Sequence, residues 1–227
     1  MSNATTMSNA ASRDADAVRY IVLRKLASGL RHTLMGELQS VQFLAELGAR
    51  NIDNGADQSR TRDCIGKISQ ATSEAIATCH SVIAWLRPEE GATTTLGDAV
   101  EQCVKLAGDD WRMRATRATV EMPGAAGEAK VSRAAARELV VTSLLALTDQ
   151  HPGSLDIEVV GALAGDRVDL RLRALASKRV APLPASIIYH ALGWDEVAVL
   201  AAAHGVLCDC KGDAATLRFA VLPPAPS

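Results

Sequence analysis

Hydrophobic positions in the first half of the chain recur at helical spacing. From about residue 15 to residue 50, apolar side chains follow one another at steps of three and four, and no proline interrupts the run. The turn-forming sequence Asn-Ile-Asp-Asn-Gly follows at 51–55, and a second periodic stretch covers 65–86 before Pro88. The pattern predicts two long helices joined by a short turn, an antiparallel hairpin over residues 14–88.

A two-helix hairpin buries only one side of each apolar stripe. We therefore expect it to pair with a second copy of the chain and to form a four-helix bundle across a homodimer. Residues 1–13 are small and polar and contain Ser-Asn-Ala twice, which is typical of an expression-tag remnant. We expect them to form a tail outside the fold.

The pattern changes to mixed helices and strands after a predicted linker at residues 89–95. The expected fold class is α+β, with the helical hairpin followed by an α/β sandwich over 96–222 and a tail at 223–227. In this second domain, Ser132 is a plausible N-cap and Gly205 a plausible helix end. The elements expected there are helices at 96–107, 132–149 and 195–204, and strands at 119–122, 155–160, 167–173, 206–210 and 216–222.

Composition and charge exclude several functional classes. Hydrophobic residues make up 48% and charged residues 22% of the chain, as in ordinary globular proteins. Lys+Arg 24 against Asp+Glu 26 gives a net charge of −2, which lacks the basic footprint of a nucleic-acid binder. No apolar run approaches the ~20 residues of a membrane span. The odd number of cysteines, five, favours a reducing cytoplasm, and Cys208 and Cys210 lack a second pair at metal-ligand spacing.

His32 stands on the polar side of the first predicted helix. The apolar stripe is centred near Leu30 and Leu34, and His32 lies about 200° round the helix from Leu30. Lys25, Gln39 and the aromatic Phe43 are expected on the same side. From position alone, an exposed histidine on a helix is more often a surface residue without function.

The sequence around His32 changes that interpretation. Residues 32–47, His-Thr-Leu-Met-Gly-Glu-Leu-Gln-Ser-Val-Gln-Phe-Leu-Ala-Glu-Leu, resemble the H-box of sensor histidine kinases, in which leucines, a β-branched residue and Ala-Glu-Leu follow the phosphoacceptor histidine. With the linker and the α/β domain, the resemblance covers residues 15–222. It implies that His32 is a phosphoacceptor, exposed so that a receiver aspartate and its metal can approach.

Three residues depart from the H-box of active kinases. Thr33 stands where these kinases usually carry the acid that acts as base in autophosphorylation. Gly36 replaces the Asn or Thr that orients water for dephosphorylation, and Glu37 replaces the proline that commonly follows.

The α/β domain resembles the ATP-binding domain of these kinases in the order of its elements but not in its chemistry. In the helix that resembles the N-box, Thr142 and Ala146 stand where Asn is expected, the latter as the magnesium ligand. Ala174 follows a strand that should lead to Asp-x-Gly-x-Gly, and only Gly193 remains of the phosphate-binding glycine loop. The resemblance therefore implies a degenerate domain that binds neither ATP nor metal, with Mg²⁺ needed only in a partner receiver.

The whole chain resembles the bacterial histidine phosphotransferases built as dimeric kinase look-alikes. We expect His32 to pass a phosphoryl group between receiver domains, with an upstream hybrid kinase as a further candidate partner, and no role for nucleic acid or membrane. The resemblance suggests Lys25, Arg31 and Gln39 as contacts of the phosphoryl group or the receiver's acidic rim, and Gly36 and Phe43 as parts of the docking face. Two alternatives stay open, an inactive scaffold that sequesters a response regulator and an ATP-dependent kinase.

Overall fold

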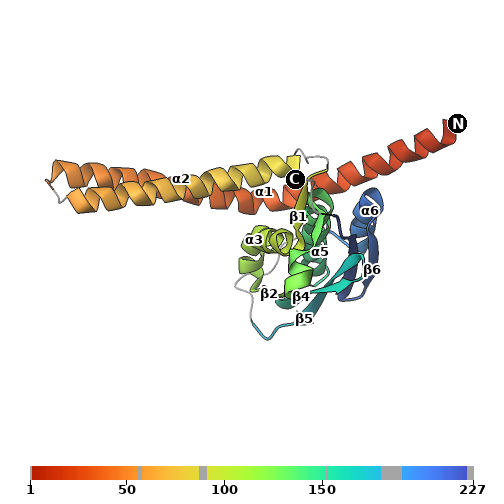
Figure 1. Cartoon of the computed structure of the whole chain (residues 1–227). Coiled ribbons are helices and arrows are strands. Elements are labelled where there is room, and N and C mark those ends of the chain that lie inside the picture. The colour runs from red at the N-terminus through yellow and green to blue at the C-terminus, as the bar shows by residue number, and fades with distance from the viewer. Residues whose placement is uncertain (1, 56–57, 87–90, 152, 180–190, 224–227) are drawn as a thin grey trace. The chain divides into compact units, whose positions relative to one another are not determined.

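The protein is described here by a computed structural model that covers residues 2–55, 58–86, 91–151, 153–179 and 191–223 (Figure 1). It divides into two compact units. One is the stretch Ala27–Pro88, and the other combines Met1–Leu26 with Glu89–Ser227.

The unit Ala27–Pro88 is a helical hairpin. Helix α1 (Ser2–Asp53) ends in a turn where Gly55 adopts a left-handed φ of 64°, and helix α2 (Gln58–Leu86) runs back beside it (Figure 1). Thr78 donates a hydrogen bond to Glu37 at 3.1 Å, and Asn51 contacts the buried Cys64 at 3.7 Å. On α1, Asn51 lies 14 residues after Glu37, and on α2 its partner Cys64 lies 14 residues before Thr78. The two contacts therefore fix an antiparallel register. The predicted helical hairpin is confirmed.

The start of α1 differs from the prediction. The helix begins at Ser2, where a tail was expected over residues 1–13. Its segment up to Leu26 packs with the α/β unit instead of with the hairpin. The side chains that are buried there recur at steps of three and four: Ala15, Val18, Val22 and Leu26.

A five-stranded mixed sheet forms the centre of the α/β unit, in the order β2-β4-β5-β7-β6. Among the strands that the structure describes, only β2 and β4 are parallel, and the other neighbouring strands of this sheet are antiparallel. A separate antiparallel pair joins β1 to β3. The strands are β1 Thr93–Thr95, β2 Arg117–Glu121, β3 Lys130–Ser132, β4 Leu155–Ala164, β5 Arg167–Ala176, β6 Leu207–Lys211 and β7 Ala214–Ala220.

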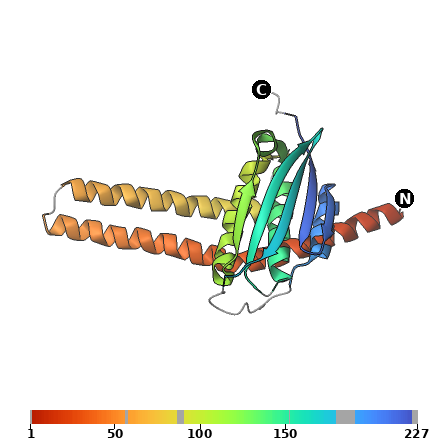
Figure 2. The same ribbon diagram turned by 90° about the horizontal axis from the view of Figure 1, so that it is seen from below.

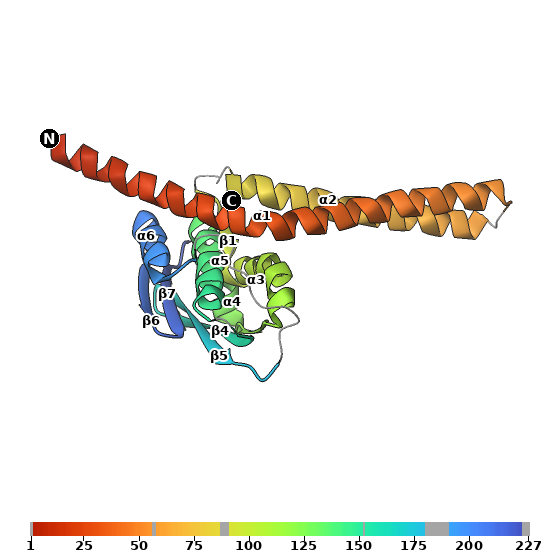
Figure 3. The ribbon, with the colours of Figure 1, turned by 180° about the vertical axis from the view of Figure 1, so that it is seen from behind.

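The helices of this unit cover one face of the sheet (Figures 2 and 3). They are α3 Leu96–Arg114, α4 Gly124–Glu128, α5 Arg133–Asp149 and α6 Trp194–His204. Side chains in β4 and β5 alternate between buried and exposed, so Ile157 and Leu170 face the helices while Glu158 and Arg171 face water. The apolar core therefore lies between the sheet and the helices, with α5 at its centre.

Most predicted elements of the α/β unit are present, with shifted ends. Ser132 caps α5, since its hydroxyl accepts the N–H of Ala135 at 3.4 Å, and Gly205 ends α6 with a φ of 63°. Strand β1 lies inside the predicted linker, and neither β3 nor α4 was expected. Elements of three to five residues are too short to show a period of two or 3.6.

Candidate functional site

His32 lies on an exposed strip of α1. Gly36, Gln39 and Phe43 follow it at steps of four, three and four, and all four residues are exposed. Phe43 keeps 65% of its surface accessible, which is unusual for an aromatic side chain. A Cβ atom added at Gly36 would meet nothing within 4 Å, so the surface beside His32 is open. Arg31 is also exposed, one residue and about 100° round the helix from His32.

The carboxylate nearest to His32 in the sequence belongs to Glu37, and it points into the hairpin. One of its oxygens accepts the hydroxyl of Thr78 at 3.1 Å, and the other is buried without a hydrogen-bond partner in the described part of the chain. Thr33, directly after His32, is half-buried. Neither residue places an acid on the strip that carries His32.

Lys25 does not belong to this strip, which corrects the prediction that it contacts a partner. It lies in the other unit, where its ammonium pairs with the carboxylate of Asp149. The side chains of Lys25 and Asp149 are 8% and 0% exposed. The pair is therefore largely buried, and the Lys25 ammonium is already bound to a carboxylate of its own chain.

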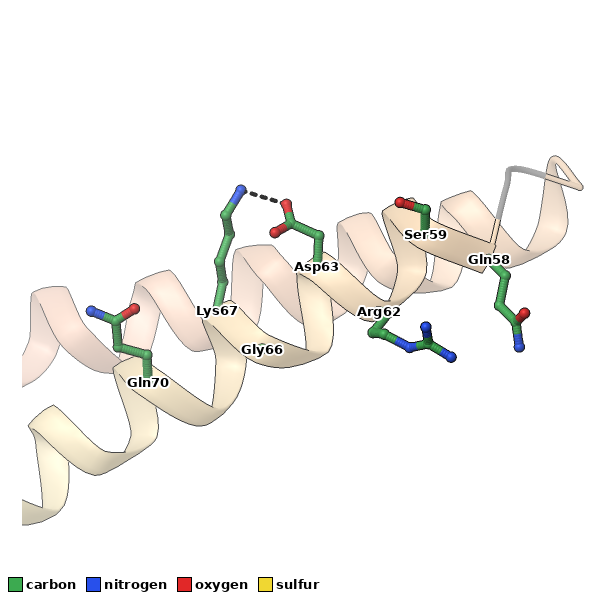
Figure 4. A pocket seen from close by; sticks show the side chains of 7 residues that line it. All are labelled: Gln58, Ser59, Arg62, Asp63, Gly66, Lys67 and Gln70. Carbon is green, nitrogen blue, oxygen red and sulfur yellow. Dashed lines mark ion pairs between the residues drawn. The ribbon is translucent and has the colours of Figure 1, made fainter.

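A shallow hollow of about 760 Å³ runs along the outside of α2 (Figure 4). It is lined by one helix only, and Asp63 and Lys67 form an exposed ion pair across it at 2.7 Å. In the hairpin register, Cys64 lies opposite Asn51, so the hollow is about 28 Å along the hairpin from His32. These features are those of a solvated helix face. The lining residues are Gln58, Ser59, Arg62, Asp63, Gly66, Lys67 and Gln70.

The side chains of α5 from Glu138 to Asp149 are buried. Thr142 and Ala146, at the two positions where the kinase resemblance expects Asn, are both 0% exposed. The Thr142 hydroxyl donates to the backbone oxygen of Glu138 at 2.6 Å, within its own helix. Both positions are thus filled by core packing.

Two backbone N–H groups just before α6 have acceptors inside the protein. Leu192 donates to the carboxylate of Asp149 and Gly193 donates to that of Glu196, each at 2.8 Å. N–H groups at a helix start are the donors that phosphate oxygens use in nucleotide sites. Here two carboxylates take their place.

A turn between β6 and β7 closes the end of β5. Ala174, at the position of the expected adenine contact, is 5% exposed and donates its N–H to the Asp213 backbone oxygen at 2.8 Å. His151 holds the Asp213 carboxylate at 3.0 Å, and the Trp194 indole donates to the Gly212 backbone oxygen at 3.0 Å. These contacts fasten the turn beside Ala174.

The described residues contain no group of three or more His, Cys, Asp or Glu side chains that could hold a metal ion. Cys208 and Cys210 carry free thiols on the edge strand β6. Burial, and next the neighbouring Cys208, raise the pKa of the Cys210 thiol to about 12. Among the described helices, none combines the length and the apolar character needed to cross a bilayer.

No protein-family profile matches the sequence, and no curated protein matches it. Several solved structures are similar. The histidine kinase AdeS of Acinetobacter baumannii shares 12% identity over 82% of this chain and 98% of its own, with a TM-score of 0.42. A bacterial phosphotransferase shares 16% identity over 87% of this chain and 95% of its own, with a TM-score of 0.40. A histidine kinase of Burkholderia phymatum shares 11% identity over 88% and 96%, also with a TM-score of 0.40. Identities and TM-scores this low carry no argument about function, so a function for this chain has to be argued from its own residues.

Proposed function

We propose that this chain is a histidine phosphotransfer protein. His32 accepts a phosphoryl group from the aspartyl phosphate of one receiver domain and passes it to the aspartate of another, without using ATP. The observation that carries the proposal is an exposed histidine on an open strip of the hairpin, in a chain whose α5 face is filled by its own side chains.

The transfer needs little from this protein beyond an accessible nitrogen. A nitrogen of the His32 imidazole attacks the phosphorus, the N–P bond forms, and the bond from phosphorus to the aspartate oxygen breaks. The receiver carboxylate leaves with the electron pair, and the ring proton goes to water. The acidic residues of a receiver hold Mg²⁺, and this ion neutralises the charge on the phosphoryl oxygens, so the absence of an acid at Thr33 does not impede the reaction.

The residues around His32 suit a docked receiver. Arg31 supplies a cation near the phosphoryl oxygens, and Gln39 supplies an amide one turn beyond Gly36. Gly36 leaves room for a receiver loop because no side chain projects there. The exposed ring of Phe43 offers the aromatic anchor on which interfaces commonly depend.

A second exposed surface of the hairpin supports the proposed homodimer. Leu38 on α1 is 48% exposed and Ile76 on α2 is 53% exposed. The hairpin register brings them level, because Glu37 lies opposite Thr78. Ile65 and Ile83, at 61% and 59%, continue the apolar row along α2. A second copy of the chain would bury these side chains in a four-helix bundle.

The proposed relay places the protein in a reducing cytoplasm, the compartment expected from its cysteines. All five are free thiols in the structure. Such thiols persist where disulfides are kept reduced.

The test compares two histidines of the same hairpin. The wild type, His32→Gln and His80→Gln are each mixed with radiolabelled phospho-receivers, and acid-labile label on the chain is measured. His80 is also exposed, so its variant controls for the loss of an imidazole. Label should disappear only in His32→Gln, with the free energy of unfolding changed by no more than about 0.5 kcal/mol in either variant. Label that persists in His32→Gln refutes the assignment, and a wild type that binds receivers tightly but takes up no label is a sequestering scaffold.

A further inference from the structure

Two carboxylates of α5 are buried against the first segment of α1. Glu138 is 4% exposed and accepts a hydrogen bond from Arg19 Nε at 2.9 Å. Three turns later, the fully buried carboxylate of Asp149 pairs with Lys25. We call residues 15–26 of α1 the cover segment, because they contribute both cations.

The cover segment also has an apolar side. Its buried residues Ala15, Val18, Val22 and Leu26 form one stripe, which supplies the hydrophobic part of the contact. Buried ion pairs lose much of their mutual attraction to desolvation, whereas breaking one of them leaves a buried charge unpaired. The apolar stripe therefore stabilises the packing of the cover segment, and the two ion pairs fix its position along α5.

Both carboxylates also bind groups on or next to α6. His204 lies 2.8 Å from the same oxygen of Glu138 that Arg19 contacts. The N–H of Leu192, two residues before α6, donates to Asp149 at 2.8 Å. Each carboxylate thus connects α1, α5 and the α6 region at one point.

We propose that the pairs Arg19–Glu138 and Lys25–Asp149 form a lock that holds the cover segment on α5, and that opening this lock changes the rate at which His32 exchanges phosphoryl groups. Helix α1 continues unbroken from the cover segment through His32, which lies six residues after Leu26. It passes from one compact unit into the other between Leu26 and Ala27. The effect on His32 rests on the proposed function, whereas the lock itself does not.

The lock is tested by hydrogen–deuterium exchange on the full chain. Lys25→Met and Asp149→Asn each remove one partner, and the double variant removes both charges. Lys67→Met is the matched control, since it breaks the exposed Lys67–Asp63 pair, whose side chains are 59% and 66% exposed. Amides of residues 18–26 should exchange on the order of a hundredfold faster in each single variant than in the wild type. In the double variant they should exchange more slowly than in either single variant, because no unpaired charge is left. The control should match the wild type.

A milder variant covers the case in which Lys25→Met fails to fold. Arg19→Met opens the other pair, while Glu138 keeps His204 as a partner. Its exchange should rise by a smaller factor over the same amides. The lock is overturned if exchange at residues 18–26 is unchanged in both Arg19→Met and Asp149→Asn. It is also overturned if the Lys25→Met/Asp149→Asn variant accelerates exchange by the product of the two single factors, because the two residues would then act independently.

The coupling to His32 is measured on the same variants as the initial rate of label uptake from a phospho-receiver. Lys25→Met should change this rate several-fold in either direction, and Lys67→Met should leave it unchanged. An opened lock with an unaltered uptake rate refutes the coupling. If the wild type takes up no label, the phosphotransfer function fails, and the exchange measurement still decides whether the lock exists.

Discussion

Replacing Ala146 by the asparagine found in active kinases should destabilise the protein without restoring nucleotide binding. Ala146 is 0% exposed in the centre of α5, and its neighbours Leu145 and Leu147 are 1% and 0% exposed. Its backbone oxygen already accepts the N–H of Gln150 at 3.1 Å at the end of the helix. The site is therefore packed on all sides, and an added side chain meets protein instead of a ligand.

The magnitude follows from three costs. Inserting extra heavy atoms into a packed core costs about 1–3 kcal/mol. An amide buried without partners costs about 1–3 kcal/mol more, and the lower helix propensity of Asn about 0.6 kcal/mol. Since relaxation offsets part of the sum, Ala146→Asn should lower the free energy of unfolding by about 2–5 kcal/mol. Trp111, buried in α3 of the same unit, provides a fluorescence signal for urea denaturation.

Ala198→Asn is the matched control, because Ala198 is exposed on α6. It should cost only the propensity difference, about 0.6 kcal/mol. Calorimetry should detect no saturable Mg-ATP binding tighter than about 1 mM, roughly −4 kcal/mol, in the wild type or in either variant. An Ala146→Asn protein as stable as Ala198→Asn would contradict the close packing around Ala146, and one that binds Mg-ATP would refute the proposal that the chain works without ATP.

Three further outcomes test other surfaces. Phe43→Ala should weaken receiver binding about tenfold or more in calorimetry, while the free energy of unfolding stays within about 0.5 kcal/mol, since the ring is 65% exposed. Leu38→Asp places a charge in the proposed bundle and should give monomers in sedimentation, whereas Gln39→Asp should stay dimeric; dimers in both would place the interface elsewhere. Because burial, and next Cys208, raise the pKa of the Cys210 thiol to about 12, this thiol should react with iodoacetamide at pH 8 at least about tenfold more slowly than free cysteine, and equal rates would contradict the raised pKa.

The sequence predicts those elements whose signals are local. Long runs at helical spacing identify the hairpin, and Gly55 marks its turn. The Ser132 cap and the Gly205 end are readable because single residues determine them. Alternation identifies β4 and β5, since one face of each strand is buried and the other is in water.

The sequence does not show which part of the fold buries an apolar helix face. Val22 and Leu26 continue at the same spacing into Leu30 and Leu34, so the run reads as one helix face. In the structure the first pair belongs to the α/β unit and the second to the hairpin. For the same reason, the sequence predicts the position of Lys25 on the helix but not the carboxylate of Asp149 with which it pairs.

The proposal that this chain does not use ATP rests on more than a set of missing ligands. If only the side chains at positions 146 and 174 had changed, an empty site would remain, and restoring those residues could restore binding. Instead, the N–H groups of Leu192 and Gly193 donate to carboxylates within the protein. Asp149 also pairs with Lys25, so displacing it from Leu192 would disturb a buried ion pair. Filled donors and absent ligands are independent features, and both support the proposal that His32, and not a bound nucleotide, carries the phosphoryl group.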